Sequence, residues 1–201
     1  MSVLDLARAD IRALSPYSSA RMEAQGGTVL LNANESSRPP NIPGGDGLNR
    51  YPDPQPRALV ETLAELYGSE ANRVLVTRGS DEAIDLLVRA FCRAGEDAVV
   101  ISPPTFGMYA VCARIQGAAV IESPLEPSGA LDADALLAAV TPATRLVFVC
   151  TPNNPTGNLV ERSILKRLAV ELAGRAVLVI DEAYAEFSGV PSATSLIDEH
   201  D

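Results

Sequence analysis

Short apolar runs alternate with amphipathic segments through most of the 201-residue chain, and this alternation limits the folds that it can adopt. The apolar runs predict strands at 74–76, 98–101, 118–121, 146–150 and 176–180. The segments between them carry apolar residues at helical spacing and predict helices at 56–67, 80–94, 105–116, 132–140 and 161–172. Strands this short and uniformly apolar are covered on both faces, and their alternation with helices favours a mostly parallel sheet. We therefore expect a three-layer α/β/α fold.

The first fifty residues have a different character. Residues 3–14 predict a short amphipathic helix, whereas residues 15–56 are rich in Gly, Pro, Asn and Ser and show no regular period. Because so long an irregular stretch is uncommon inside a compact domain, we expect an arm that lies over a site or a partner subunit. We divide the chain accordingly into a helix and arm, 1–50, and a large domain, 51–201.

The composition disfavours several kinds of partner. A formal net charge of −10 repels phosphate backbones, so we expect no nucleic acid, although a helix N-terminus can still attract a small anion. Cys92, Cys112 and Cys150 lack metal-ligand spacing and predict buried thiols in a reducing compartment, with no metal site. No apolar run is long enough to span a bilayer, and charged residues interrupt the N-terminal segment. We expect a cytoplasmic protein without a signal peptide.

Polar residues follow two of the predicted strands, at the edge where open α/β sheets bind ligands. Asn154 lies in a turn whose path is fixed by two prolines and a glycine, and Asp181 follows five apolar residues. A buried carboxylate without a partner is costly, and a cationic ring nitrogen would supply that partner. Tyr184, three residues further on, has a phenol for an oxygen of the same ring. The plainer alternatives are an Asx–Pro turn for Asn154 and local amide bonds for Asp181.

Two other turns carry possible ligand groups. Gly79 allows a tight turn, and Ser80 is placed to cap the next helix, whose first N–H groups would hold a phosphate. Phe106 stands beside Gly107, where a flat ring has room to stack on it. Each turn taken alone is more simply explained by ordinary structure, as a βα turn and as a core aromatic.

Together these motifs resemble the class II aminotransferases of fold type I, which use pyridoxal 5'-phosphate (PLP). The resemblance rests on Thr-Arg-Gly-Ser-Asp-Glu (77–82), Pro-Thr-Phe-Gly-Met-Tyr (104–109), Pro-Asn-Asn-Pro-Thr-Gly (152–157) and Asp-Glu-Ala-Tyr (181–184). Within that family, Leu-Asn-Ala-Asn-Glu (31–35) and Asn-Arg-Tyr-Pro-Asp-Pro (49–54) resemble histidinol-phosphate aminotransferases. The implied fold is the PLP-binding large domain of fold type I, incomplete at its C-terminus.

The resemblance also implies roles for individual residues. Those that it assigns to the cofactor phosphate are Gly79, Ser80 and Asp81. Those that it assigns to the pyridine ring are Phe106 for stacking, Asn154 and Tyr184 for the phenolate oxygen, and Asp181 for the nitrogen. Tyr51 would reach the cofactor phosphate of a neighbouring subunit, which implies a homodimer, and Tyr17 and Asn34 would border the substrate.

The lysine content departs from the family pattern. The only lysine is Lys166, within a predicted helix, and the Ser-Lys stretch that carries the family's Schiff-base lysine beyond Asp181 is absent. Because lysine supplies both the amine and the base of transamination, we expect no catalytic residue here and no turnover by the chain alone. The expected protein is an amino-terminal fragment of an enzyme that transaminates histidinol phosphate with 2-oxoglutarate. Alternatives are an aromatic aminotransferase, a threonine-phosphate decarboxylase-like enzyme, or a non-catalytic fragment.

Overall fold

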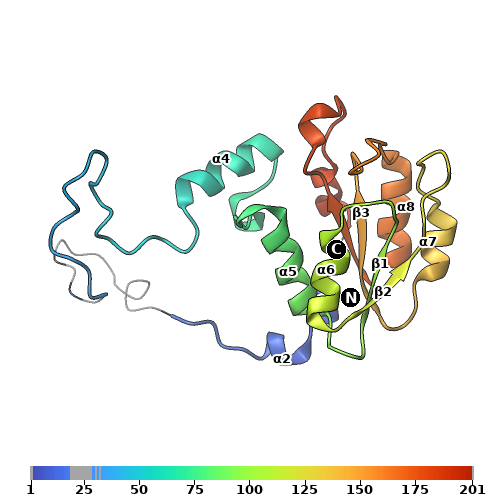
Figure 1. Cartoon of the computed structure of the whole chain (residues 1–201), viewed down its shortest axis with the longest axis horizontal. Helices are drawn as coiled ribbons and strands as arrows, with labels where there is room; N and C mark the ends of the chain where they lie inside the picture. The colour runs from blue at the N-terminus through green and yellow to red at the C-terminus, as the bar shows by residue number, and fades with distance from the viewer. Residues whose placement is uncertain (1, 19–28, 30, 32, 201) are drawn as a thin grey trace.

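A parallel sheet forms the centre of the protein (Figure 1). The computed structural model describes residues 2–18, 29, 31 and 33–200. Its four strands lie in the order β2-β1-β3-β4. They are β1 (Ala98–Ile101), β2 (Ala119–Glu122), β3 (Thr144–Cys150) and β4 (Val177–Asp181). All neighbouring strands pair in parallel, so their carboxyl ends share one edge of the sheet.

Helices cover both faces of this sheet. The α-helices are α1 (Val3–Leu6), α2 (Ala9–Arg12), α4 (Arg57–Tyr67), α5 (Gly79–Phe91), α6 (Met108–Gln116), α7 (Ala133–Ala139) and α8 (Arg162–Leu172). Three 3₁₀ helices are η1 (Ala71–Arg73), η2 (Ala185–Phe187) and η3 (Ala193–Asp198). Helices α5 and α6 pack on one face and α7 and α8 on the other (Figure 1). The expected three-layer fold with a parallel sheet is confirmed.

The strand β3 shows why the central runs are apolar throughout. Leu146, Phe148 and Cys150 belong to the core beneath α5 and α6. Val147 and Val149, which alternate with them, belong to the core beneath α7 and α8. Because successive side chains point to opposite faces, every position of a strand covered on both sides faces a core and favours an apolar residue.

Two predicted elements differ in the structure. Residues 3–14 form two short helices, because the Arg8 N–H donates to the Ala90 carbonyl at 3.0 Å and leaves the helical ladder. The predicted strand at 74–76 is extended but pairs with no strand in the described part of the chain. Instead, the Gln55 side-chain amide forms two hydrogen bonds with the Val76 backbone. It accepts from the Val76 N–H at 2.7 Å and donates to the Val76 carbonyl at 3.0 Å.

The three cysteines lie in the interior of the protein. All three cysteines are free thiols and buried, as predicted. Burial raises the pKa of the Cys92 thiol to about 12, which suppresses its reactive thiolate form. None of the helices in the described ranges is long and apolar enough to cross a membrane.

An ion pair between a buried carboxylate and a partly exposed arginine joins strands at the amino edge of the sheet. The Asp97 carboxylate is 4% exposed and accepts from Arg145 Nε at 2.8 Å through Oδ1. Its other oxygen accepts the Arg93 N–H at 2.8 Å. Arg145 lies on β3, and Asp97 immediately precedes β1, so this contact joins two central strands.

We predict that Arg145→Ala lowers the free energy of unfolding by roughly 3–5 kcal/mol, because it leaves a buried carboxylate without its cation. Urea denaturation followed by circular dichroism measures this loss. Arg57→Ala is the control, since it breaks an exposed pair with Glu61 on one helix and is expected to change little. Equal effects of the two substitutions would contradict this account of the amino edge.

Candidate functional site

The carboxyl edge of the sheet gathers most of the predicted ligand residues. β1, β3 and β4 end there, and the following loops carry Phe106, Asn154 and Tyr184, while Asp181 is the last residue of β4. Cys150 stands opposite Asp181 in the ladder, and the Thr151 N–H donates to the Asp181 carbonyl at 2.9 Å. The pairing of β3 with β4 therefore fixes the position of the Asp181 backbone relative to the Asn154 loop.

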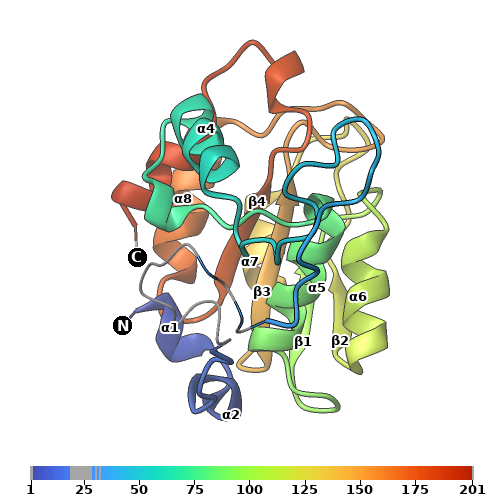
Figure 2. The ribbon, with the colours of Figure 1, turned by 90° about the vertical axis from the view of Figure 1, so that its left-hand side faces the viewer.

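The first turn of α5 reaches the same edge. This helix leads directly into β1 and runs antiparallel to the strands, so that it starts near their carboxyl ends (Figure 2). Gly79 has φ of +75°, a conformation that favours glycine, and a Cβ there would meet nothing within 4 Å. The N–H groups of Ser80 and Asp81 have no acceptor among the described residues. They are available to an anion.

Ser80 does not cap this helix, contrary to the prediction. α5 begins one residue earlier, with Arg78 at the N-cap and no side-chain capping bond. The Glu82 carboxylate takes over part of that function by accepting the Arg78 N–H at 2.6 Å. That bond lowers the pKa of Glu82. The Ser80 hydroxyl therefore makes no capping bond to the helix that it was expected to start.

Asp181 has partners that the sequence did not reveal. It is partly buried, and its Oδ2 accepts the phenol of Tyr109 at 2.6 Å. Its Oδ1 accepts the Ala183 N–H at 3.0 Å. The expectation of an unpartnered carboxylate is therefore wrong, and the alternative of local amide bonds holds for one oxygen. Both partners are neutral donors, so the negative charge is oriented without being cancelled.

Tyr109 is fixed by the aromatic residues around it. It has no exposed surface, and its ring stacks on Phe148 with centroids 4.6 Å apart and planes at 10°. Phe106 meets the same ring edge-to-face at 5.7 Å. Burial and, to a smaller extent, the bond to Asp181 raise the pKa of Tyr109, so the phenol remains a donor. Its place in the first turn of α6 is the only sequence signal, since 72 residues separate it from Asp181.

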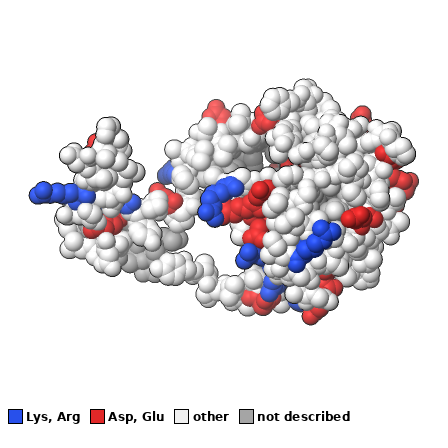
Figure 3. Space-filling model, viewed as in Figure 1, with Lys and Arg blue, Asp and Glu red and all other residues white. Residues whose placement is uncertain are grey.

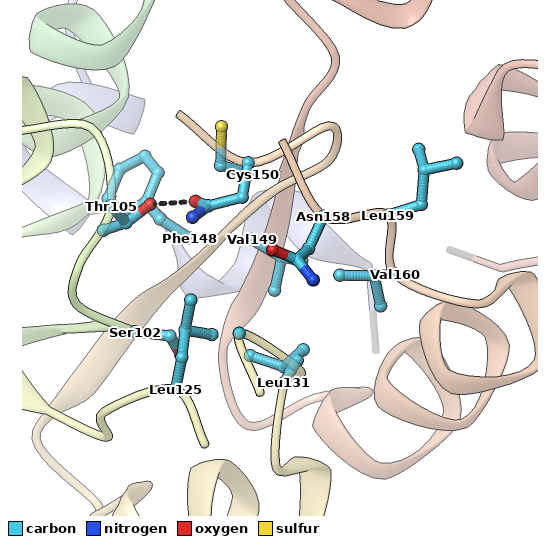
Figure 4. A pocket seen from close by; sticks show the side chains of 12 residues that line it. Ser102, Thr105, Leu125, Leu131, Phe148, Val149, Cys150, Asn158, Leu159 and Val160 are labelled. Carbon is cyan, nitrogen blue, oxygen red and sulfur yellow. Dashed lines mark hydrogen bonds between the residues drawn. The ribbon is translucent and has the colours of Figure 1, made fainter. Parts of the chain in front are cut away.

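One buried amide ties two of the loops together. Asn153 Oδ1 accepts the Thr105 hydroxyl at 2.8 Å, a bond drawn in Figure 4. Asn153 Nδ2 donates to the Pro104 carbonyl and to the Thr156 hydroxyl, both at 2.9 Å. The loop that carries Phe106 is thus joined to the loop that carries Asn154.

The cavity behind these loops is too small for a ring. It has a volume of about 10 Å³, whereas small-molecule pockets usually measure roughly 300–1,000 Å³ (Figure 4). A Cβ on Gly107, in contrast, would meet nothing within 4 Å, so the space beside Phe106 is open. A flat ligand that contacts these loops would therefore have to lie outside the cavity.

Two predicted ring-binding side chains carry unused polar groups. Asn154 is partly exposed, and neither its amide nor the phenol of Tyr184 makes a hydrogen bond within the described chain. Tyr184 is 44% exposed and occupies the N-cap of η2. Both side chains are free to bind a ligand at this edge.

The residues expected from the irregular stretch 15–56 lie elsewhere. Tyr17, Asn34 and Tyr51 are exposed, and no contact within the described chain joins them to the carboxyl edge. Residues 33–50 of the arm stand away from the sheet (Figure 1). Tyr51 is nevertheless held locally, since Glu35 accepts its N–H at 2.7 Å and pairs with Arg50 at 2.8 Å.

Lys166 occupies the helical layer opposite α5 and α6. It lies on α8, and its Nζ pairs with Glu199 Oε2 at 2.6 Å. This pair lowers the pKa of Glu199. The solvated surface charge predicted for Lys166 is confirmed.

Within the ranges that the structure describes, no group of three acidic, Cys or His side chains is arranged to hold a metal.

Comparison with known proteins decides the family. The sequence profile described as "Aminotransferase class I and II" matches residues 28–200. The chain belongs to this family. Its resemblance to aminotransferases and its expected fold class are thereby confirmed, whereas the roles of single residues remain predictions.

Individual aminotransferases extend the comparison. The histidinol-phosphate aminotransferase of Xanthomonas euvesicatoria pv. vesicatoria (strain 85-10) is 48% identical over 100% of this chain. That of Stenotrophomonas maltophilia (strain R551-3) is 50% identical over 98% of this chain. The matches cover 56% of each relative, so the chain spans little more than half their length. The solved histidinol-phosphate aminotransferase of Sinorhizobium meliloti, in complex with PLP, is 28% identical with a TM-score of 0.63, over 68% of this chain and 37% of that one.

We predict that Asn153→Ala destabilises the protein by about 3 kcal/mol, because three buried hydrogen bonds worth about 1 kcal/mol each are lost. Urea denaturation measures the change. Asn158→Ala is the matched control in the same loop, since that amide makes one long bond of 3.4 Å to the Ser128 carbonyl. An Asn153 variant no less stable than the Asn158 variant would show that the two loops are not held by this amide.

Proposed function

We propose that this chain forms the PLP-binding part of a homodimeric, cytoplasmic aminotransferase that acts on histidinol phosphate and 2-oxoglutarate in histidine biosynthesis. The observation that carries the cofactor assignment is the Asp181 carboxylate, oriented by two neutral donors at the carboxyl end of β4. The names of the relatives that match along the whole chain support the substrate. In this proposal residues 1–50 are the N-terminal helix and arm, and residues 51–201 are the cofactor domain.

The donor set of the carboxyl edge fits PLP. The groups available to the phosphate are the N–H groups of Ser80 and Asp81, beside the open space at Gly79. The groups available to the ring are the face of Phe106, the Asn154 amide, the Tyr184 phenol and the Asp181 carboxylate. PLP, when bound, supplies a carbonyl carbon for the substrate amine and a ring that withdraws electrons from it.

The residues of this chain bind and orient the cofactor. An anion at the start of α5 gains from the helix dipole, by up to about 2 kcal/mol when partly buried. The Asp181 carboxylate favours the protonated form of the ring nitrogen, because an opposite charge nearby stabilises it. We assign no catalytic residue within 1–201, because Lys166 is in the opposite layer and paired with Glu199.

The arm supports the proposal of a homodimer. Figure 3 shows its described part standing apart from the body, with an open hollow between the two. Tyr51 is 61% exposed and Leu31 89% exposed, although both are apolar or aromatic. Such side chains gain by burial against a second surface. In the proposed dimer Tyr51, held by Glu35, reaches the cofactor phosphate of the neighbouring subunit.

A chimera tests the function. We expect residues 1–201, joined to the portion of the X. euvesicatoria relative that this chain does not match, to transaminate histidinol phosphate with 2-oxoglutarate. Formation of glutamate measures the rate. Residues 1–201 alone are expected to show no turnover, because their only lysine is outside the site.

The chimera also separates the alternatives. A soluble, PLP-loaded chimera that prefers an aromatic amino acid would contradict the substrate, and one that decarboxylates threonine phosphate would contradict the reaction. Asp181→Asn in the chimera is expected to lower the rate at least tenfold, because it removes the charge opposite the ring nitrogen. An unchanged rate would contradict the role of Asp181.

A further inference from the structure

A buried phenol stands directly behind the proposed cofactor site. Tyr109 donates its hydroxyl to Asp181 Oδ2 at 2.6 Å, and its ring is held between Phe148 and Phe106. Stacking at 4.6 Å on Phe148 and an edge contact at 5.7 Å with Phe106 hold the ring in this orientation. The direction of the hydroxyl, and with it the plane of the Asp181 carboxylate, is therefore set by the core.

Resting on the function proposed above, we propose that Tyr109 is a positioning residue for PLP, which holds Asp181 in the orientation that receives the protonated pyridine nitrogen. The geometry leaves room for this ligand. Ala183 occupies one site on Oδ1 and Tyr109 one site on Oδ2, whereas a carboxylate has about four acceptor sites. The carboxylate is thus held at both oxygens and still has acceptor capacity for the ring N–H.

The choice of a phenol has a chemical consequence. A Lys or Arg in the position of Tyr109 would pair with the carboxylate and compete with the ring nitrogen for its charge. A neutral donor orients the anion without cancelling its charge, so that the charge stays available to the proton on the ring nitrogen. Because burial raises the pKa of Tyr109, the phenol keeps its proton and its direction of donation.

The substitution Tyr109→Phe isolates the hydroxyl. It retains the ring that packs on Phe148 and removes only the bond to Asp181. Tyr67→Phe is the matched control, because it removes a phenol–carboxylate bond of 2.9 Å to Glu186 on the surface. The readouts on the 201-residue chain are the dissociation constant of PLP and the ¹⁵N chemical shift of PLP labelled at the ring nitrogen.

We expect Tyr109→Phe to weaken PLP binding roughly tenfold and to move the ¹⁵N shift toward that of an unprotonated pyridine. Tyr67→Phe is expected to change neither. A fluorinated tyrosine at position 109 is a stronger donor that preserves the fold, so it is expected to move the ¹⁵N shift toward the protonated value. This second variant decides the question if Tyr109→Phe fails to fold.

The outcomes separate this inference from the function on which it rests. If the wild-type chain binds PLP with a protonated nitrogen and Asp181→Asn abolishes that protonation, the cofactor site stands. If, in the same experiment, the variants at position 109 leave the ¹⁵N shift unchanged, Tyr109 has only a packing role and the inference is overturned. A wild-type chain that does not bind PLP would overturn the proposed cofactor site itself.

Discussion

The parallel pairing of β1, β3 and β4 is the constraint on which the rest of the structure depends. Because the strands run in one direction, three chain segments that are distant in sequence end at one edge of the sheet. The register then sets the positions of single residues, since Cys150 opposite Asp181 aligns the Asn154 loop with the end of β4. Helices cover both faces of the paired strands. Both faces therefore carry apolar residues, and these belong to two separate cores.

The carboxyl edge combines a fixed backbone with a charge that is oriented but not neutralised. Asn153 joins two of its loops, and Tyr109 and Ala183 hold the two oxygens of Asp181. Among the described residues, the cation that the sequence offers as a candidate amine, Lys166, is paired in another layer. The described chain therefore has the features of a binding and orienting surface, in agreement with its membership of the aminotransferase family.

Sequence patterns predict the strands that are covered on both faces and the helices that are amphipathic. The sequence predicts β1 with its observed bounds, and β3, β4 and α8 to within two residues. Strands covered on both faces form uninterrupted apolar runs, and amphipathic helices repeat apolar residues at helical spacing. The segment 74–76 has the composition of a strand, but a strand also needs a neighbour, and here only Gln55 bonds to it. The contact of Tyr109 with Asp181 was missed because no local pattern reports a bond across the core.

The most direct test of this account is a crystal structure of the chain with PLP. We predict that the pyridine nitrogen lies within hydrogen-bonding distance of Asp181, about 2.7–3.2 Å, while Asp181 retains its bond from Tyr109. The ring of Phe106 should face the pyridine, and the phosphate should lie on the first turn of α5. PLP bound away from Asp181, or with its ring nitrogen facing solvent, would contradict the account.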